Sequence, residues 1–436
     1  MKSNIMFYDK KEDSIRCKLC PHNCILKENK FGVCNVRTVE NNIGIAINYG
    51  EVTSANIDPI EKKPLCHYKP GKNILSVGTF GCNMSCSFCQ NYEISQQVQK
   101  SEYIETDKLI NIIETLNDNI GIAFTYNEPF MWYEYIYDVV KKIKGRNKDI
   151  STVLVTNGYV NKKPLEKILP YIDAMNIDLK GYTNKYYNNI CGAKLEPVLD
   201  TIALASKYCH IEITTLMVRG ENDSIDEIEN IAKFIASVDK NIPLHLSRYF
   251  PRYNLNNPPT DIESIIKARD IAKRYLNYVY IGNVAGVDNN TYCPDCNEKC
   301  IKHGVLKSGS QRWFCKHCKV AFTVKINNLS KELNLFLNWL FSTDIQADMP
   351  GKGRTFRRKT AKFWSIWPLP PKVEEVHDVV YLDGIYLSRN LCVLICCNDT
   401  HVLGWYVCRY EHARAWQCLM ERIAEPKVVV SDGANG

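Results

Sequence analysis

Hydrophobic and polar positions along residues 73–282 follow a pattern that predicts alternating strands and helices. Short apolar runs bounded by polar residues, such as 152–156, are typical of buried strands. Longer segments between them, such as 225–238, repeat apolar residues every three or four positions and indicate amphipathic helices. Since the two alternate, we expect a parallel sheet with helices outside it, closed or partly closed into a barrel. The expected strands are 73–77, 121–125, 152–156, 174–179, 211–218, 242–247 and 278–282, and the expected helices are 108–116, 130–144, 163–169, 198–207, 225–238 and 262–275.

The pattern changes in the last third of the chain. Residues 331–341 predict an amphipathic helix, and 349–359 predict a basic loop or helix start. Strands are then expected at 379–387, 391–397, 401–408 and 427–432, with a helix at 412–423 before the last of them. Asp383 lies in the middle of the first strand and Asp432 at the end of the fourth. This β-β-β-α-β order is that of the opening of an RNase H-like fold, in which paired carboxylates hold two Mg²⁺ ions.

Three cysteines that follow the strand 73–77 suggest reactive metal chemistry. Cys82, Cys86 and Cys89 are spaced C-x3-C-x2-C. An iron–sulfur cube normally takes four thiolates, so three of them leave one iron without a protein ligand. A reactive metal site needs such an open position, and a structural site does not. A structural zinc knuckle and three unrelated thiols are the two other interpretations.

Polar residues recur where the predicted strands end. Because the carboxyl ends of parallel strands meet at one edge, we expect these side chains around one axis. Each alone has a simpler interpretation as a turn former, a helix cap or a surface charge, but their recurrence favours one binding site. These residues are Glu128, Asn157, Asp178, Lys180, Met217, Arg219, His245, Arg248 and Asn283.

Further cysteines form two groups with metal-ligand spacing. Cys17, Cys20, Cys24 and Cys34 are spaced C-x2-C-x3-C-x9-C and predict a second metal site, for zinc or for an auxiliary iron–sulfur cluster. Cys293, Cys296, Cys315 and Cys318 are spaced C-x2-C-x18-C-x2-C, which is typical of a zinc ribbon. Cys300 lies near the second group and leaves its ligand assignment open. We expect buried free thiols at Cys66, Cys191 and Cys209.

Charge and aromatic content divide the chain near residues 292–300. Residues 1–294 carry 35 Lys and Arg against 34 Asp and Glu, whereas residues 295–436 carry 20 against 14. Six of the seven tryptophans lie beyond residue 310. The segments 299–331 and 352–372 contain no acidic residue, so the last third is expected to face a polyanion, with weak DNA binding. A ribbon that is purely structural, with a solvated basic face, is the alternative.

Residues 1–292 resemble the pyruvate formate-lyase activating-enzyme branch of radical S-adenosylmethionine (SAM) enzymes, and within it the AmmeMemoRadiSam group. The resemblance implies a partial (β/α)6 barrel, a 4Fe–4S cluster on Cys82, Cys86 and Cys89, and SAM as co-substrate. It also implies that Phe88 packs near adenine and that Glu128 accepts from the SAM amino group. Asp178 and Lys180 would help to hold SAM, and we expect Asn157, His245 and Asn283 to contact it too. The segments that carry the resemblance are 17–24, 60–65, 82–91, 126–129, 176–181, 247–251 and 282–283.

Residues 293–436 resemble insertion-sequence transposases of the DDE type that begin with a zinc ribbon. Asp383 and Asp432 match the first two of that family's three acidic residues. The third acid lies on a later helix, and the sequence ends at Gly436. We therefore expect a truncated, RNase H-like fragment with a vestigial Mg²⁺ site and without strand-cleavage activity.

Together these features predict an α/β protein with five parts. They are a Cys-rich segment (1–65), a radical SAM barrel (66–292), a zinc ribbon (293–325), a basic helical linker (326–375) and a transposase fragment (376–436). The expected reaction is reductive cleavage of SAM, followed by hydrogen abstraction from a protein or small-molecule substrate. A DNA-binding transposase remnant and an iron–sulfur electron carrier are the alternatives.

The same features predict a redox partner and a cellular location for the protein. The resemblance implies a reductant such as flavodoxin or ferredoxin. Twenty cysteines, with no export signal and no apolar run of about 20 residues, predict a cytoplasmic protein without a membrane span.

Overall fold

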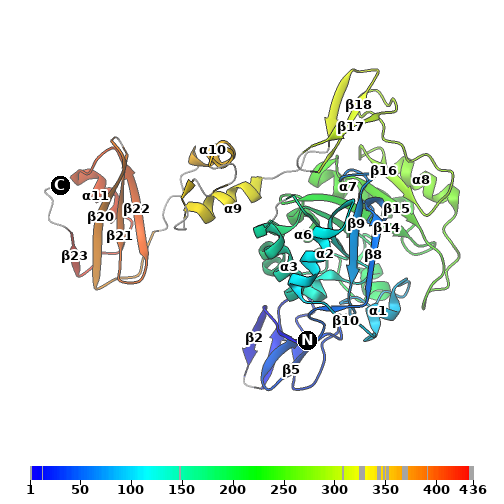
Figure 1. Cartoon of the computed structure of the whole chain (residues 1–436), viewed down its shortest axis with the longest axis horizontal. Coiled ribbons are helices and arrows are strands. Elements are labelled where there is room, and N and C mark those ends of the chain that lie inside the picture. Colours follow the sequence, from blue (N-terminus) through cyan, green and yellow to red (C-terminus); the bar gives the residue numbers. More distant parts are fainter. Residues whose placement is uncertain are drawn as a thin grey trace. The chain divides into compact units, whose positions relative to one another are not determined.

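The computed structural model divides the chain into two compact units, Met1–Asn338 and Trp339–Gly436 (Figure 1). Each unit has its own buried core. It describes residues 2–11, 13–146, 149–306, 309–323, 329–340, 345–346, 349, 353–365, 372–389 and 391–431. None of the helices formed by these residues is long and apolar enough to cross a membrane.

An eight-stranded sheet forms the centre of the first unit. Its strand order is β16-β15-β14-β13-β12-β11-β9-β8. All neighbours from β9 to β16 pair in parallel, and β8 adds an antiparallel strand at the edge. The strands are β8 (Ser54–Pro59), β9 (Asn73–Gly78), β11 (Asn119–Phe124), β12 (Ser151–Thr156), β13 (Ala174–Asp178), β14 (His210–Met217), β15 (Leu244–Arg248) and β16 (Val279–Gly282).

Helices follow these strands at the predicted places, which confirms the alternating α/β pattern. Helix α7 shows the cause: the Ser224 side chain caps its first turn by accepting from the Glu227 amide. Its buried residues Ile228, Ile231 and Ile235 recur at a spacing of three and four, so one face packs on the sheet. The helices are α2 (Thr106–Thr115), α3 (Tyr133–Arg146), α4 (Lys162–Ile168), α6 (Glu196–Ala205), α7 (Ile225–Asp239) and α8 (Ile262–Ala272).

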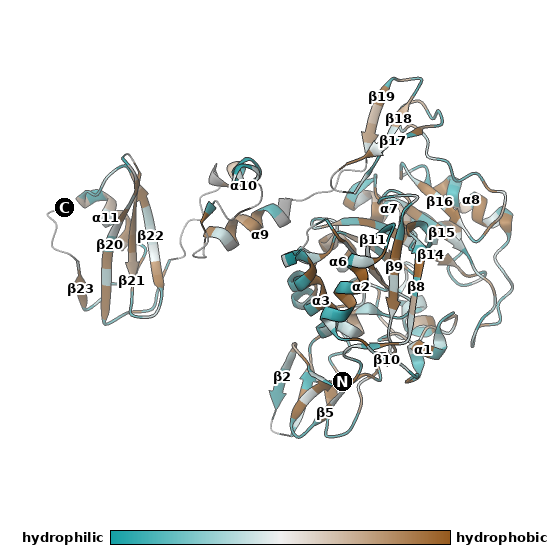
Figure 2. Cartoon of the chain, in the orientation of Figure 1, coloured by the Kyte–Doolittle hydropathy of each residue, from teal (hydrophilic) through white to brown (hydrophobic). Residues whose placement is uncertain are grey.

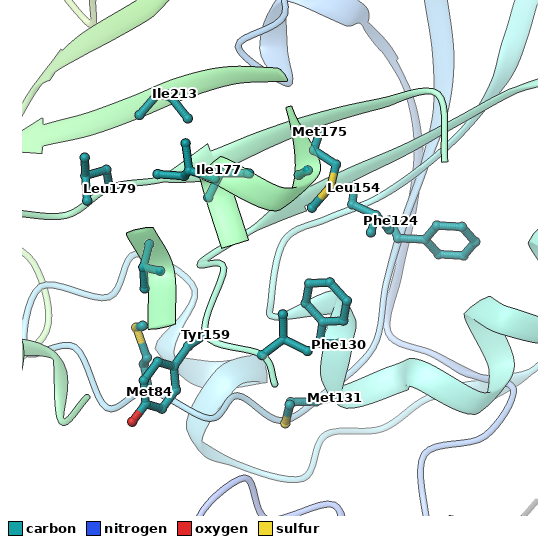
Figure 3. Close-up of a cluster of buried hydrophobic side chains, with 14 of the residues drawn as sticks. Met84, Phe124, Phe130, Met131, Leu154, Tyr159, Met175, Ile177, Leu179 and Ile213 are labelled. Carbon is teal, nitrogen blue, oxygen red and sulfur yellow. The ribbon is translucent and has the colours of Figure 1, made fainter. Parts of the chain in front are cut away.

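The core of this unit lies between the sheet and its helices. Buried side chains from successive strands, among them Phe124, Leu154 and Ile177, meet there (Figure 3). Figure 2 shows brown along strands such as β9 and both colours on surrounding helices such as α3. Parallel strands with both faces covered are hydrophobic almost throughout, and five of the six residues of β12 are buried.

Short antiparallel strands precede the barrel. One sheet has the order β1-β6-β5, with β1 (Ser3–Asn4), β5 (Arg37–Glu40) and β6 (Ile43–Ala46). The other has the order β2-β3-β4, with β2 (Tyr8–Lys11), β3 (Ser14–Cys17) and β4 (Ile25–Leu26). Two-residue strands β7 (Glu51–Val52) and β10 (Glu102–Tyr103) pair with each other beside the barrel.

The predicted zinc ribbon belongs to the first compact unit, although composition places a boundary near residues 292–300. Its antiparallel strands are β17 (Ile301–Val305), β18 (Gln311–Cys315) and β19 (Val320–Thr323). The Gln311 amide donates to the His67 carbonyl (2.9 Å), and the Trp313 ring lies 5.6 Å from the His67 ring. Tyr278 stacks on Phe322. These contacts join the ribbon to the barrel, and charge composition does not record contacts of this kind.

The second unit contains a four-stranded sheet of order β22-β21-β20-β23. Strands β20, β21 and β22 are antiparallel neighbours, and β23 pairs in parallel with β20. Helix α11 lies against this sheet through Ala415 and Leu419, and the predicted order β-β-β-α-β is confirmed. The elements are α10 (Arg354–Thr360), β20 (Val379–Ser388), β21 (Leu391–Cys397), β22 (Val402–Cys408), α11 (Ala413–Met420) and β23 (Val428–Val430), and α9 (Leu329–Leu340) precedes them.

Two isoleucines of α7 test whether the burial pattern carries the stability of the barrel. Ile231 is fully buried, whereas Ile225 is 64% exposed. We expect Ile231→Ala to lower the free energy of unfolding by about 2–5 kcal/mol, since it removes buried methyl groups and leaves a cavity. Ile225→Ala serves as the control and is expected to change it by about 0.5 kcal/mol or less. Urea unfolding followed by circular dichroism measures both, and equal shifts would contradict this packing.

Candidate functional site

A cavity of about 710 Å³ opens at the carboxyl ends of the barrel strands. Its volume lies within the range of about 300–1,000 Å³ that small-molecule sites occupy. Residues of β12, β13, β14 and β15 or of the loops after them line it, among them Asn157, Asp178, Leu216 and Ser247. The cavity therefore lies where the strand pattern predicts ligand groups.

The loop after β9 brings Cys82, Cys86 and Cys89 to this cavity. Backbone contacts hold the loop: the Ser85 amide donates to the Cys191 carbonyl (2.9 Å), and the Ser87 amide donates to that of Ile190 (3.0 Å). The loop begins at Gly81, whose φ is +94°. A Cβ at Gly81 would lie 2.8 Å from the Cys34 carbonyl oxygen, so only glycine fits without a shift of the backbone.

Cys191 lies beside this loop, and its sequence spacing gave no sign of that. Its thiol is completely buried and lies beside the Cys86 thiol. The prediction of a buried thiol is confirmed for Cys191 and also for Cys209, which is 2% exposed. The residue lies more than a hundred positions from the loop, so only the fold reveals the contact.

Glu128 is a buried carboxylate in the wall of the cavity, with 2% of its surface exposed. One oxygen accepts from the Thr156 hydroxyl (2.7 Å) and the Phe130 amide (3.0 Å). The other accepts from the Asn157 amide (2.7 Å). Burial raises the pKa of Glu128 to about 7, although these hydrogen bonds oppose the rise. The carboxyl group can therefore change its charge near neutral pH.

Asp178 and Lys180 form an ion pair on the same wall. Lys180 Nζ lies 2.8 Å from Asp178 Oδ2 and 5.7 Å from the centre of the Phe88 ring. Burial disfavours the lysine cation, but Asp178 and neighbouring thiols outweigh that and hold its pKa above the usual value. A positive charge thus lies beside the cysteine loop, where it can face an anionic group.

The other residues predicted at strand ends fall into two sets. Asn157 and Asn283 line the cavity, and the Asn283 side chain donates to the Arg248 carbonyl (3.2 Å). His245 does not line the cavity. Its imidazole lies 2.7 Å from a Glu212 oxygen inside the barrel. Met217, Arg219 and Arg248 also lie outside the cavity lining.

Glu212, which the sequence pattern did not single out, is the centre of a buried network below the cavity. Its carboxylate accepts from His210 (2.9 Å) and His245 (2.7 Å), and from the backbone amides of Cys66 and His67. Burial alone would raise the pKa of Glu212, but the two histidines outweigh it and lower that pKa. Cys66 Sγ lies within 4.8 Å of donor atoms of Glu212 and His245, so Cys66 belongs to this cluster and is only half-buried.

A second set of polar residues in the cavity wall was also missed. Lys63 Nζ lies 2.8 Å from Asp58 Oδ2 and 4.7 Å from the centre of the Tyr126 ring. The Tyr126 hydroxyl donates to the same Asp58 oxygen (2.9 Å), and Tyr126 adopts a φ of +75°. Strain of this kind is concentrated at functional sites. Lys63 and Tyr126 lie in the segments 60–65 and 126–129 that carry the resemblance, and this was the available signal.

The two remaining cysteine groups lie apart from this cavity. Cys17, Cys20, Cys24 and Cys34 line a small cavity of their own together with Arg37. In the ribbon, Cys293, Cys296, Cys315 and Cys318 converge, with donor atoms all within 4.8 Å of one another. Cys300 is outside that group, and its thiol donates to the Glu298 carbonyl (3.6 Å).

Only one of the two predicted Mg²⁺ ligands in the second unit lies among the described residues. Asp383 is exposed in β20, where it pairs in register with Ile395. Asp432 lies outside the described residues. The vestigial site therefore stays a prediction.

Comparison with known proteins identifies relatives of the barrel. The family model of the radical SAM superfamily matches residues 76–235. An uncharacterized protein of Methanocaldococcus jannaschii is 42% identical over 312 residues, which cover 70% of this chain and 92% of that protein. A putative glycyl-radical enzyme activating enzyme of the same organism is 30% identical over 210 residues, 46% of this chain and 77% of that protein.

Among solved structures, a domain of pyruvate-formate lyase-activating enzyme from Bacteroides vulgatus is similar to this chain. It is 21% identical with a TM-score of 0.33, and the match covers 37% of this chain and 99% of that domain.

The sulfur distances in the ribbon predict bound zinc. Cys293 Sγ lies 4.0 Å from Cys318 Sγ, and Cys296 Sγ lies 3.5 Å from Cys315 Sγ. Tetrahedral zinc with Zn–S bonds of about 2.3 Å places its sulfurs roughly 3.8 Å apart. We expect Cys296→Ser/Cys315→Ser to lose about one zinc per chain, measured by mass spectrometry of the metals. Cys300→Ser is the matched control and is expected to retain the zinc. A control that loses zinc, while the double variant retains it, would contradict the assignment of Cys296 and Cys315 as ligands.

Proposed function

The chain belongs to the radical SAM superfamily, and on that premise we propose that it cleaves SAM reductively at a 4Fe–4S cluster held by Cys82, Cys86 and Cys89. The observation that carries this proposal is that all three thiols line one cavity together with the polar ends of the barrel strands. Three thiolates leave one iron without a protein ligand, and the cavity beside it has the volume of a small-molecule site. When bound, the cluster supplies one electron that breaks a carbon–sulfur bond of SAM, releasing methionine and a 5′-deoxyadenosyl radical.

The residues of the wall have the chemistry to hold SAM. Glu128 has a free lone-pair position beside three hydrogen bonds and can accept from the SAM amino group. Lys180 and Asp178 present both charges to the zwitterionic methionine end. Phe88 offers a flat apolar surface to adenine, and Asn157 and Asn283 offer amide groups. His245 lies outside the cavity lining and binds Glu212, so we assign it a positioning role and no contact with SAM.

We infer the class of the further substrate from the relatives and from the second set of polar residues in the cavity wall. One relative is named a putative glycyl-radical enzyme activating enzyme, and we extend that activity to this chain: hydrogen abstraction from a protein or small molecule. Asp58, Lys63 and Tyr126 also line the cavity and have no assigned SAM contact, so they are the side chains that we assign to a second molecule. The reaction requires a one-electron reductant such as flavodoxin or ferredoxin.

For the second unit we propose a relationship to the RNase H-like fold of DDE transposases. Support comes from its strand order β22-β21-β20-β23, with β23 parallel to β20. Asp383 lies on β20, the strand that carries the first acid of that family. DNA binding by the basic last third stays a prediction from charge.

Cys86→Ala tests the radical chemistry. Anaerobically reconstituted wild type with SAM and dithionite is expected to form 5′-deoxyadenosine, measured by liquid chromatography and mass spectrometry. The variant is expected to form none above background, because two thiolates cannot hold the cluster. Cys209→Ala, another buried thiol outside the cavity lining, is the matched control and is expected to match wild type. Equal amounts of 5′-deoxyadenosine from wild type and Cys86→Ala would refute the proposal. A wild type that contains iron but does not cleave SAM would favour an electron carrier.

The raised pKa of Glu128 predicts pH-dependent binding of SAM. Below about pH 7 the carboxyl group takes up a proton and loses the charge that attracts the ammonium of SAM. The Kd for SAM is therefore expected to rise as pH falls, by up to about tenfold per pH unit well below the pKa. Equilibrium dialysis with reconstituted protein at about pH 6 and about pH 8 measures this. Glu128→Gln, which cannot titrate, should bind more weakly and show no such dependence; an identical slope in both proteins would contradict the role of Glu128.

A further inference from the structure

The four N-terminal cysteines surround a buried cavity that the proposed SAM reaction does not use. Cys17 ends β3, and Cys20, Cys24 and Cys34 lie in the loops that follow. All four line the same small cavity, and all except the half-buried Cys24 are less than 9% exposed. Four thiols around one enclosed space, without a disulfide between them, indicate a metal centre.

The spacing of these thiols differs from that of the ribbon. In the ribbon all four donor sulfurs lie within 4.8 Å of one another, which suits a single ion. Among the described residues, no three of the N-terminal thiols are this close. The same is true of the three thiols of the cluster loop. An iron–sulfur cube takes one thiolate on each iron, so its ligand sulfurs stand farther apart than those around one zinc ion.

The wall of this cavity contains a buried cation that has unpaired hydrogen-bond donors. Arg37 is 1% exposed, and its Nη2 donates to Glu134 (2.6 Å). Its Nε and Nη1 are buried without a hydrogen-bond partner. Buried donors nearly always have an acceptor, and an unpaired charged donor is costly. A cluster with four thiolate ligands is an anion whose sulfurs can accept from these groups.

A short chain of side chains connects the two sets of thiols. The Asn83 side chain lies beside the Cys20 thiol. Asn83 Oδ1 accepts from Asn157 Nδ2 (3.0 Å), which also lies 3.7 Å from Cys82 Sγ. Asn83, on this route, is completely buried. Two metal centres here would be neighbours across two asparagine side chains.

We infer that Cys17, Cys20, Cys24 and Cys34 hold a second 4Fe–4S cluster, which passes electrons to the cluster at Cys82, Cys86 and Cys89. The relay rests on the proposed function for its electron acceptor, whereas the second cluster itself does not. A low-potential one-electron protein reductant gives one electron to the second cluster, which returns to its oxidised state when the loop cluster takes that electron. No bond or proton changes in this step.

Metal analysis of a loop variant tests the second cluster by itself. Cys82→Ala/Cys86→Ala/Cys89→Ala removes the first cluster, and the reconstituted protein is expected to stay brown with about four irons and four sulfides per chain. Adding Cys17→Ala/Cys34→Ala is expected to remove that iron, whereas adding Cys209→Ala as matched control is expected to leave it. A loop variant that holds zinc in addition to that of the ribbon, or holds no iron, overturns the inference. This count does not depend on SAM cleavage, so it is unaffected if the proposed function fails.

The relay is tested in the chain with an intact loop. We expect Cys17→Ala/Cys34→Ala to lower the rate at which reduced flavodoxin reduces the loop cluster by about tenfold more than it lowers the rate with dithionite. Freeze-quench electron paramagnetic resonance of the loop cluster measures both rates. A small reductant reaches the loop cluster directly, so an unchanged ratio of the two rates overturns the relay.

Discussion

The predicted SAM site depends on one buried carboxylate, that of Glu128. Three donors from two neighbouring strand ends converge on it: the Phe130 amide after β11, and the Thr156 hydroxyl and Asn157 amide at the end of β12. A buried carboxylate without such partners would cost several kcal/mol, so the strand ends must stay where the donors are. The Asn157 side chain then reaches Cys82 and Asn83 in the cluster loop. The same carboxylate therefore fixes the cavity wall and, through Asn157, the position of the loop.

Glu212 has the corresponding role at the other end of the barrel. It takes donors from His210 and His245 and from the amides of Cys66 and His67, so it holds the segment that enters β9. The His67 ring packs against Trp313, and burial lowers the pKa of His67 to about 3, which keeps it neutral. A neutral ring can be covered by an aromatic side chain without the cost of burying a charge. The ribbon can dock on the barrel at this place for that reason.

The sequence allowed the barrel to be predicted almost element by element, because the short apolar runs of strands and the three-or-four-residue spacing of helices are both local patterns. The buried network around Glu212 could not be predicted in this way. In β15 the side chains of His245 and Ser247 point to the same face of the strand, so only their depth along the barrel axis decides which of them reaches the cavity, and the sequence pattern does not give that depth. His245 lies below the cavity, whereas Ser247 lines it. Cys191 and Asp58 reach the site from distant segments with no periodic pattern, and only the tertiary fold brings them there.

The three cysteine groups show what sequence spacing cannot distinguish. Each contains a C-x2-C pair, and that pair is compatible with zinc and with iron–sulfur clusters. The rest of each group decides the separation of the sulfurs: in the ribbon, two such pairs face each other across short antiparallel strands and close around one ion. In the N-terminal segment a single pair is completed by thiols from longer loops, around a space that also admits the unpaired donors of Arg37. The buried Nε and Nη1 of Arg37 lack an acceptor, and the proposed iron–sulfur cluster with its four thiolate ligands would supply one.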